Sequence, residues 1–194
     1  MSETKIANPG PLGLSGFALT TLLLSLVNAG IINATKDVPS AVGAVLASAL
    51  FYGGTAQLLA GMWEFRTGNT FGAYAFTSYG AFWLSIAASA IFPAFGFLGD
   101  PTAKGYFLLG WTIVTAILTI ASFRTNGATV AVFVLLLITF ILLTVGTLGD
   151  NTSIYQIGGY FGIATAIAAW YTALAGVLTA TSGGKMNLPV FPLA

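Results

Sequence analysis

The chain has 194 residues, of which 57% are hydrophobic and only 6% are charged, and its formal net charge is +1. A soluble domain carries about 25% charged residues, so this chain cannot cover a water-facing surface and must be surrounded by lipid. The small net charge argues against a nucleic-acid-binding protein, which needs a concentrated basic patch. Cysteine and histidine are absent from the sequence. The thiolate and imidazole ligands of most transition-metal sites are therefore missing, and we expect no metal and no cofactor.

Apolar stretches separated by short polar segments run along the whole sequence. Each is near or above the roughly 20 residues that a helix needs to cross about 30 Å of hydrocarbon. None shows the alternating polarity of a transmembrane β-strand. We therefore expect an all-α integral membrane protein, a six-transmembrane-helix bundle that forms a single membrane domain over residues 1–194. The expected spans are residues 11–32, 41–63, 70–95, 104–123, 128–148 and 154–181.

Aromatic residues and glycines recur together in alternate spans, at Phe51-Tyr52-Gly53, Gly105-Tyr106-Phe107 and Gly159-Tyr160-Phe161-Gly162. Three helix hairpins around a central pathway would produce such a repeat. Chance recurrence in a chain rich in glycine and aromatic residues explains it equally well.

The charged residues fall at span ends or in loops, so the distribution of Lys and Arg predicts the orientation. One side of the membrane would hold Lys5, Arg66, Arg124 and Lys185, whereas the other would hold Lys36 and Lys104. The two residues on the second side each have an aspartate close by in the sequence. We therefore expect both termini to be cytoplasmic in a multi-pass protein of the cell membrane.

Neutral polar residues follow helical spacing inside the spans. In the first span Phe17, Thr21, Ser25 and Asn28 share one face, and the fourth span carries a run of threonines from Thr112 to Thr119. Each stripe alone is explained by hydroxyls that bond a carbonyl one turn back or by close helix packing. Several stripes in one small bundle favour a shared polar path instead. Such a path suits a small polar or weakly acidic solute better than a bare metal cation, which is coordinated by carboxylates or by rings of carbonyl oxygens.

The first span begins with the motif Asn8-Pro9-Gly10-Pro11-Leu12-Gly13-Leu14. Pro11 suits the first helical turn, where its missing N–H costs nothing, and Asn8 can cap the chain. The free N–H groups of a helix start attract anions, so a carboxylate arriving here would meet a ready site. A good helix start without a ligand explains the same residues.

This motif closely resembles the Asn-Pro-Ala-Pro-Leu-Gly-Leu signature of the acetate/succinate transporter family, the YaaH group of microbial acetate uptake proteins. Gly10 replaces the alanine of the signature. Three more segments are similar to the second, third and sixth helices of that family. They are residues 51–57 (Phe51 to Gln57), residues 68–83 (Gly68 to Trp83) and residues 159–171 (Gly159 to Tyr171).

The resemblance implies transport of small monocarboxylates, chiefly acetate and in some members succinate, through a separate pathway in each protomer of a hexameric ring. Matched by position, a narrow constriction would fall on Phe17, Tyr79 and Leu136, and Ala169 would matter for substrate choice. The resemblance, the motif and the polar faces of the first two spans together suggest a set of substrate-binding residues. These are Asn8, Pro11, Leu12, Gly13, Thr21, Tyr52 and Thr55.

Two other functions fit the sequence less well. A channel for a neutral solute such as urea or ammonia would suit the uncharged lining. A membrane scaffold without transport would need few polar residues inside its spans. A membrane enzyme is not expected, because no His, Cys or interior carboxylate pair is present to act as base or nucleophile.

Overall fold

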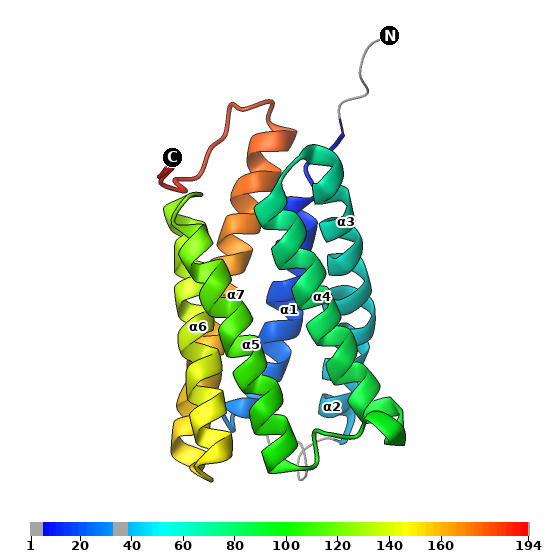
Figure 1. Ribbon diagram of the computed structural model, residues 1–194. Coiled ribbons are helices and arrows are strands. Elements are labelled where there is room, and N and C mark those ends of the chain that lie inside the picture. The colour runs from blue at the N-terminus through cyan, green and yellow to red at the C-terminus, as the bar shows by residue number, and fades with distance from the viewer. Residues whose placement is uncertain (1–5, 33–38, 194) are drawn as a thin grey trace.

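The structure, a computed structural model, describes residues 6–32 and 39–193. These residues form a helical bundle, so the predicted fold class is confirmed (Figure 1). The elements in chain order are α1 (Gly10–Asn28), α2 (Pro39–Leu50), the π-helical turn η1 (Phe51–Ala56), α3 (Gln57–Thr67), α4 (Thr70–Ile91), the 3-10 turn η2 (Pro93–Phe95), α5 (Pro101–Ser122), α6 (Gly127–Leu148) and α7 (Thr152–Thr181). Lys5, Lys36 and the neighbouring Asp37 lie outside the described residues.

The second span is one continuous helix with a wide turn in its middle. It runs through α2, η1 and α3, and its membrane-spanning part, Val42–Thr67, has 26 residues. The glycines of η1 allow α1 and α4 to approach closely: a Cβ atom on Gly53 would lie 2.7 Å from Cβ of Thr20 and 2.9 Å from Cδ1 of Trp83. Thr55 Oγ1 donates a hydrogen bond to the Leu50 carbonyl at 2.7 Å, which helps to satisfy the widened turn.

The third span is shorter than the expected residues 70–95. The helix α4 ends at Ile91, because Phe92 precedes Pro93 and adopts the extended conformation that a following proline favours. Among the described residues, five helical segments are long and apolar enough to cross a membrane by hydropathy, and α4 is not one of them. Its hydropathy is lowered by hydroxyl and aromatic residues. Its 22 residues nevertheless extend about 33 Å, which matches the thickness of the hydrocarbon core.

Side-chain caps fix the beginnings of four described helices. Three of these helices begin before the expected apolar stretch: α5 by three residues, α6 by one and α7 by two. The caps are Asn69 for α4, Asp100 for α5, Asn126 for α6 and Asn151 for α7. In each case a side-chain oxygen accepts a backbone N–H of the first turn, which would otherwise have no partner. Hydrophobicity alone does not detect such a cap, so the expected starts at residues 104, 128 and 154 were slightly late.

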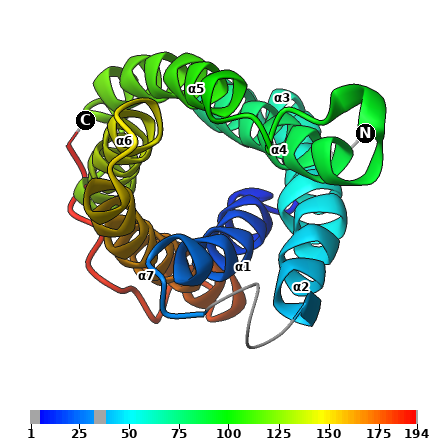
Figure 2. The same cartoon turned by 90° about the horizontal axis from the view of Figure 1, so that it is seen from below.

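The helices surround a common axis. Seen along the bundle, α4, α5, α6, α7 and α1 follow one another around a ring, and α2 and α3 lie on the outside of α1 and α4 (Figure 2). The pairs α3–α4 and α5–α6 are packed hairpins, whereas α1 packs mainly on α7, far away in the sequence. Both described ends of the chain lie at the same end of the bundle as the α3–α4 turn (Figure 1).

Candidate functional site

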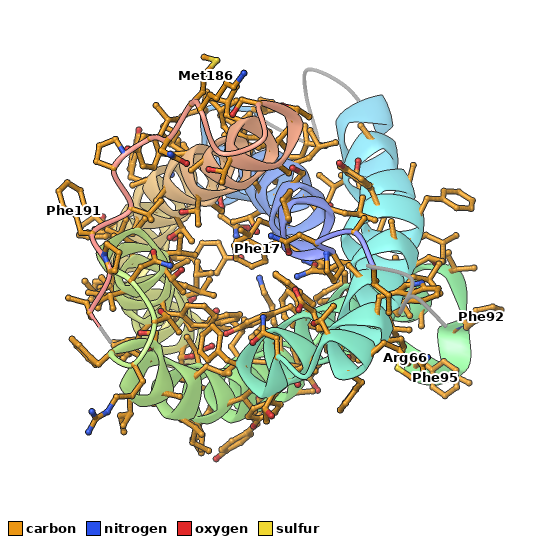
Figure 3. All side chains as sticks on the ribbon, turned by 90° about the horizontal axis from the view of Figure 1, so that it is seen from above. Phe17, Arg66, Phe92, Phe95, Met186 and Phe191 are labelled. Atoms are coloured by element: carbon orange, nitrogen blue, oxygen red, sulfur yellow. The ribbon has the colours of Figure 1, made fainter. Side chains whose placement is uncertain are left out.

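The three residues predicted to form a constriction lie buried inside the bundle. Phe17 from α1, Tyr79 from α4 and Leu136 from α6 are buried with exposed fractions of 5%, 2% and 3%. The ring centroids of Phe17 and Tyr79 are 5.5 Å apart, and those of Tyr79 and Phe133 are 6.3 Å apart. Phe17 points toward the middle of the ring of helices (Figure 3). The three predicted constriction residues are thus gathered from three helices, and Phe133 joins them. We define these four residues as the collar.

The Tyr79 hydroxyl group is fixed by α5. It lies 2.9 Å from Thr115 Oγ1, which itself donates to the Trp111 carbonyl at 2.7 Å. Because the threonine proton is used, the tyrosine must donate to the threonine. The Tyr79 oxygen therefore keeps lone pairs as acceptors, and a passing group that carries an acidic proton could donate to them.

Of the two cavities that the collar residues line, the larger lies on the N-terminal side of the collar and has a volume of about 840 Å³. Asn8, Gly10 and Pro11 at the beginning of α1 line it, and so does Phe133 of the collar. The backbone N–H of Gly10 donates to Asn8 Oδ1 at 2.9 Å, so Asn8 occupies one of the free amides of the helix start. The motif thus lies at the cavity, where the sequence placed an entry for the substrate.

Glu64 at the end of the second span lines the same cavity and is 2% exposed. Its Oε2 accepts hydrogen bonds from Asn69 Nδ2 at 3.0 Å and from Thr67 Oγ1 at 3.1 Å. Its Oε1 is buried without a hydrogen-bond partner among the described residues. A Cβ atom on Gly10 would lie 3.5 Å from this oxygen, so the carboxyl group faces the beginning of α1.

The second cavity lies on the other side of the collar and has a volume of about 430 Å³. Phe17, Tyr79 and Leu136 line its inner end, and no residue lines both cavities. The polar stripe of α1 faces this cavity, since Thr21, Ser25 and Asn28 all belong to its lining. The collar residues therefore line two separate cavities of one bundle, and we call these two cavities the vestibules.

The other predicted site residues lie away from the two cavities. Leu12 is 45% exposed on the outside of α1, and a Cβ atom on Gly13 would meet the Phe76 ring at 2.6 Å, so Gly13 is a close-packing position. Tyr52 and Thr55 belong to η1, and the side chain of Thr55 is exposed. Ala169 is fully buried in the apolar core of α7. The structure does not bring these residues to the collar, and their roles stay predictions.

The threonine stripe of the fourth span serves mainly its own helix. Thr112, Thr115 and Thr119 each donate to the carbonyl four residues earlier, at 2.7 to 2.8 Å. This is the ordinary role of hydroxyls in apolar helices. Thr115 also reaches the collar through the Tyr79 hydroxyl group, and Thr119 through the Phe133 carbonyl at 3.2 Å.

The C-terminal segment was not expected to contribute to the pathway. Residues 187–192 line the larger cavity. Figure 3 shows this segment on the outer side of the bundle at Phe191. Gly127 and Ala128 donate their N–H groups to the carbonyls of Phe191 and Val190 at 2.8 and 3.1 Å. The segment thus occupies the free amides at the beginning of α6. Pro189 and Pro192 interrupt regular structure in this segment, and no sequence signal shows where it docks.

Comparison with known proteins identifies the family. The model of the GPR1/FUN34/yaaH family matches residues 1–194. The succinate-acetate/proton symporter SatP of Escherichia coli K12 is 38% identical over 192 residues, which cover 98% of each chain. Ammonia transport outward protein 2 of Saccharomyces cerevisiae is 42% identical over 183 residues, which cover 90% of this chain but only 63% of that protein. A solved structure of the bacterial acetate channel SatP aligns with a TM-score of 0.85 and 37% identity, and covers 96% of this chain and 99% of that one. The chain therefore belongs to the GPR1/FUN34/yaaH family of multi-pass membrane proteins.

Proposed function

We propose that the protein transports small monocarboxylates across the membrane, chiefly acetate and with succinate as a second candidate substrate, through a pathway within each protomer. The observation that carries the proposal is the collar of Phe17, Tyr79, Phe133 and Leu136 between two cavities. The names of the SatP relatives support the same substrate class.

The collar favours a neutral acid over an ion. Taking a charge out of water without replacement is very costly, so three apolar side chains in a ring resist hydrated ions. A small carboxylic acid can pass with its methyl group against Phe17 and Leu136. Its acidic proton can meanwhile be donated to the Tyr79 oxygen, whose own proton goes to Thr115.

A channel for ammonia or another small neutral solute is the alternative. The name of the Saccharomyces relative favours it, and an uncharged collar would pass such a molecule as well. Uptake by proteoliposomes separates the two functions. For a monocarboxylate transporter, uptake of radiolabelled acetate is saturable and is inhibited by propionate, whereas urea and ammonium do not compete. Rapid ammonia flux without saturable acetate uptake would favour the alternative.

A homohexamer is the proposed assembly. Many large apolar side chains point outward from the bundle, among them Phe51, Tyr106, Ile113 and Ile120, so neighbouring subunits or lipid must cover them. Native mass spectrometry in mild detergent is expected to show six copies. A monomer as the only species would contradict the assembly.

Both termini are proposed to be cytoplasmic. Arg66, Arg124 and Lys185 lie at the end of the bundle that holds the termini, and Lys104 lies at the other end, which agrees with the positive-inside rule. Because the chain has no cysteine, a single cysteine introduced at Ser153 or Ser182 reports orientation directly. An impermeant thiol reagent added to intact cells should label the Ser153→Cys variant alone, and the reverse pattern would invert the topology.

Replacing Asn8 by alanine is expected to slow acetate uptake severalfold without unfolding the protein. The change removes the hydrogen bond to the Gly10 N–H and one polar group from the larger cavity. Loss of one such hydrogen bond costs about 1 kcal/mol, which a bundle of this size tolerates. Asn151→Ala is the matched control, because it also removes a hydrogen bond from a backbone N–H to an asparagine side chain at a helix start, at the other end of the bundle. Unchanged uptake by folded Asn8→Ala protein would remove the motif from the mechanism.

A further inference from the structure

A basic side chain lies at the outer part of the second cavity, held by residues from two other helices. Lys104 in the first turn of α5 donates from Nζ to the Tyr155 hydroxyl group of α7 at 2.8 Å. The Tyr155 hydroxyl group in turn donates to Asn28 Oδ1 of α1 at 2.9 Å. The ammonium also lies 4.4 Å from the centroid of the Tyr155 ring. Three helices thus hold one positive charge in a fixed place.

The neighbouring aspartates are engaged elsewhere or lie outside this cavity. Asp100 directs its Oδ1 to the N–H groups of Thr102 and Ala103, at 2.8 and 3.3 Å, as the cap of α5. Asp150 shares with Lys104 a small outer pocket but does not line the second cavity. Among the described residues that line the second cavity, Lys104 alone carries a charge. The neutral partners Tyr155 and Asn28 orient this charge without cancelling it.

The surroundings strengthen the attraction of Lys104 for an anion. An ammonium group has three N–H donors, and one of them is used by Tyr155. The cavity wall next to it is largely apolar, with Phe107, Leu98 and Leu143 among its residues. A charge-assisted hydrogen bond is stronger beside such a wall than in open water.

The cavity on the other side of the collar has the opposite character. Among the described residues that line this larger cavity, the one with a charged side chain is Glu64, which repels an anion when it is ionised. The two vestibules therefore do not offer equivalent first contacts to a carboxylate.

We propose that Lys104, positioned by Tyr155 and Asn28, is a docking site for the carboxylate form of the substrate at the mouth of the second cavity. The inference rests on the proposed transport of monocarboxylates and adds a specificity-determining residue to it. The anion is bound at Lys104, takes up a proton from the surrounding water, crosses the collar as the neutral acid and releases that proton to the water on the far side. The site thus raises the occupancy of the vestibule at pH values where almost all of the substrate is ionised.

Equilibrium exchange of radiolabelled acetate in proteoliposomes tests the site, with the same acetate concentration on both sides so that the protein's direction in the vesicle does not matter. At pH 7 the Lys104→Gln variant is expected to need about tenfold more acetate for half-maximal exchange, which corresponds to about 1.4 kcal/mol. Lys104→Arg should stay within about threefold of the unchanged protein, because it keeps the charge. Near pH 4, where much of the substrate is neutral, the Gln variant and the unchanged protein should converge.

Lys185→Gln is the matched control, since it removes an exposed lysine of the C-terminal segment that lines neither cavity. Half-saturation of Lys104→Gln within twofold of the unchanged protein at pH 7 would overturn the proposal. An equal loss at pH 4 and pH 7 would also overturn it, because it would indicate a structural role. If the unchanged protein exchanged no acetate at all, the proposed function itself would fail, which is a different result.

Discussion

Replacing Leu136 by alanine is expected to let succinate and lactate through a pathway that otherwise favours acetate. Leu136 is 3% exposed and completes the apolar collar beside Phe17 and Tyr79. Removing most of its side chain widens the ring where the two vestibules meet. The ratio of lactate to acetate uptake should then rise about tenfold or more, since a change of about 1.4 kcal/mol in a barrier is a factor of ten. Phe17→Ala should shift selectivity in the same direction.

The same change costs stability, so selectivity must be measured against a matched truncation. A buried Leu→Ala substitution loses about 2–5 kcal/mol in soluble proteins. Leu118→Ala provides the control, because Leu118 is fully buried in the core and lines neither cavity. Both variants should lose thermal stability in detergent, but only Leu136→Ala should gain lactate uptake per folded molecule.

The opposite pattern would assign the collar to packing. If acetate uptake fell in step with folded protein in both variants and larger acids gained nothing, then Leu136 and Phe17 would be ordinary core residues. Initial rates for acetate, lactate and succinate, divided by the amount of monodisperse protein, distinguish the two cases.

Much of the bundle could be predicted from hydrophobicity, because each span must be apolar over the whole thickness of the membrane. The polar stripe of α1 could be predicted as well, because helical spacing alone places Thr21, Ser25 and Asn28 on one face. The structure shows that this face lines the second cavity. The boundaries were less certain, because they depend on Pro93 and on caps such as Asn126 rather than on hydrophobicity.

The parts that sequence reasoning missed depend on contacts between distant segments. Phe133 reaches the collar from a span that is apolar all round, so no periodicity separates it from its neighbours. Lys104 was counted only as a charge at a span end. Its role as a candidate binding group depends on contacts that only the fold creates. Tyr155 lies 51 residues from Lys104 in the sequence, and Asn28 lies 127 residues from Tyr155. Hydrogen bonds between such distant residues leave no pattern in the local sequence that could predict them.

Acetate uptake is expected to rise steeply as external pH falls, because the substrate carries the proton across the collar. A small carboxylic acid titrates near pH 4–5, as Asp and Glu side chains do, so its neutral fraction falls about tenfold for each pH unit above that range. At fixed total acetate well below saturation, initial uptake should therefore fall by more than tenfold between pH 5 and pH 7.

Glu64 is the carboxyl group that could carry the proton instead, since it lies buried at the larger cavity with one oxygen free of described partners. Glu64→Gln keeps the shape of the side chain and an oxygen that can accept from Asn69. If the substrate carries the proton, this variant keeps the pH slope of uptake even where its overall rate changes. A flat pH profile in Glu64→Gln protein with preserved uptake at pH 7 would show that the carboxyl group relays the proton. The collar would then pass the anion, against the high cost of desolvating a charge between three apolar side chains.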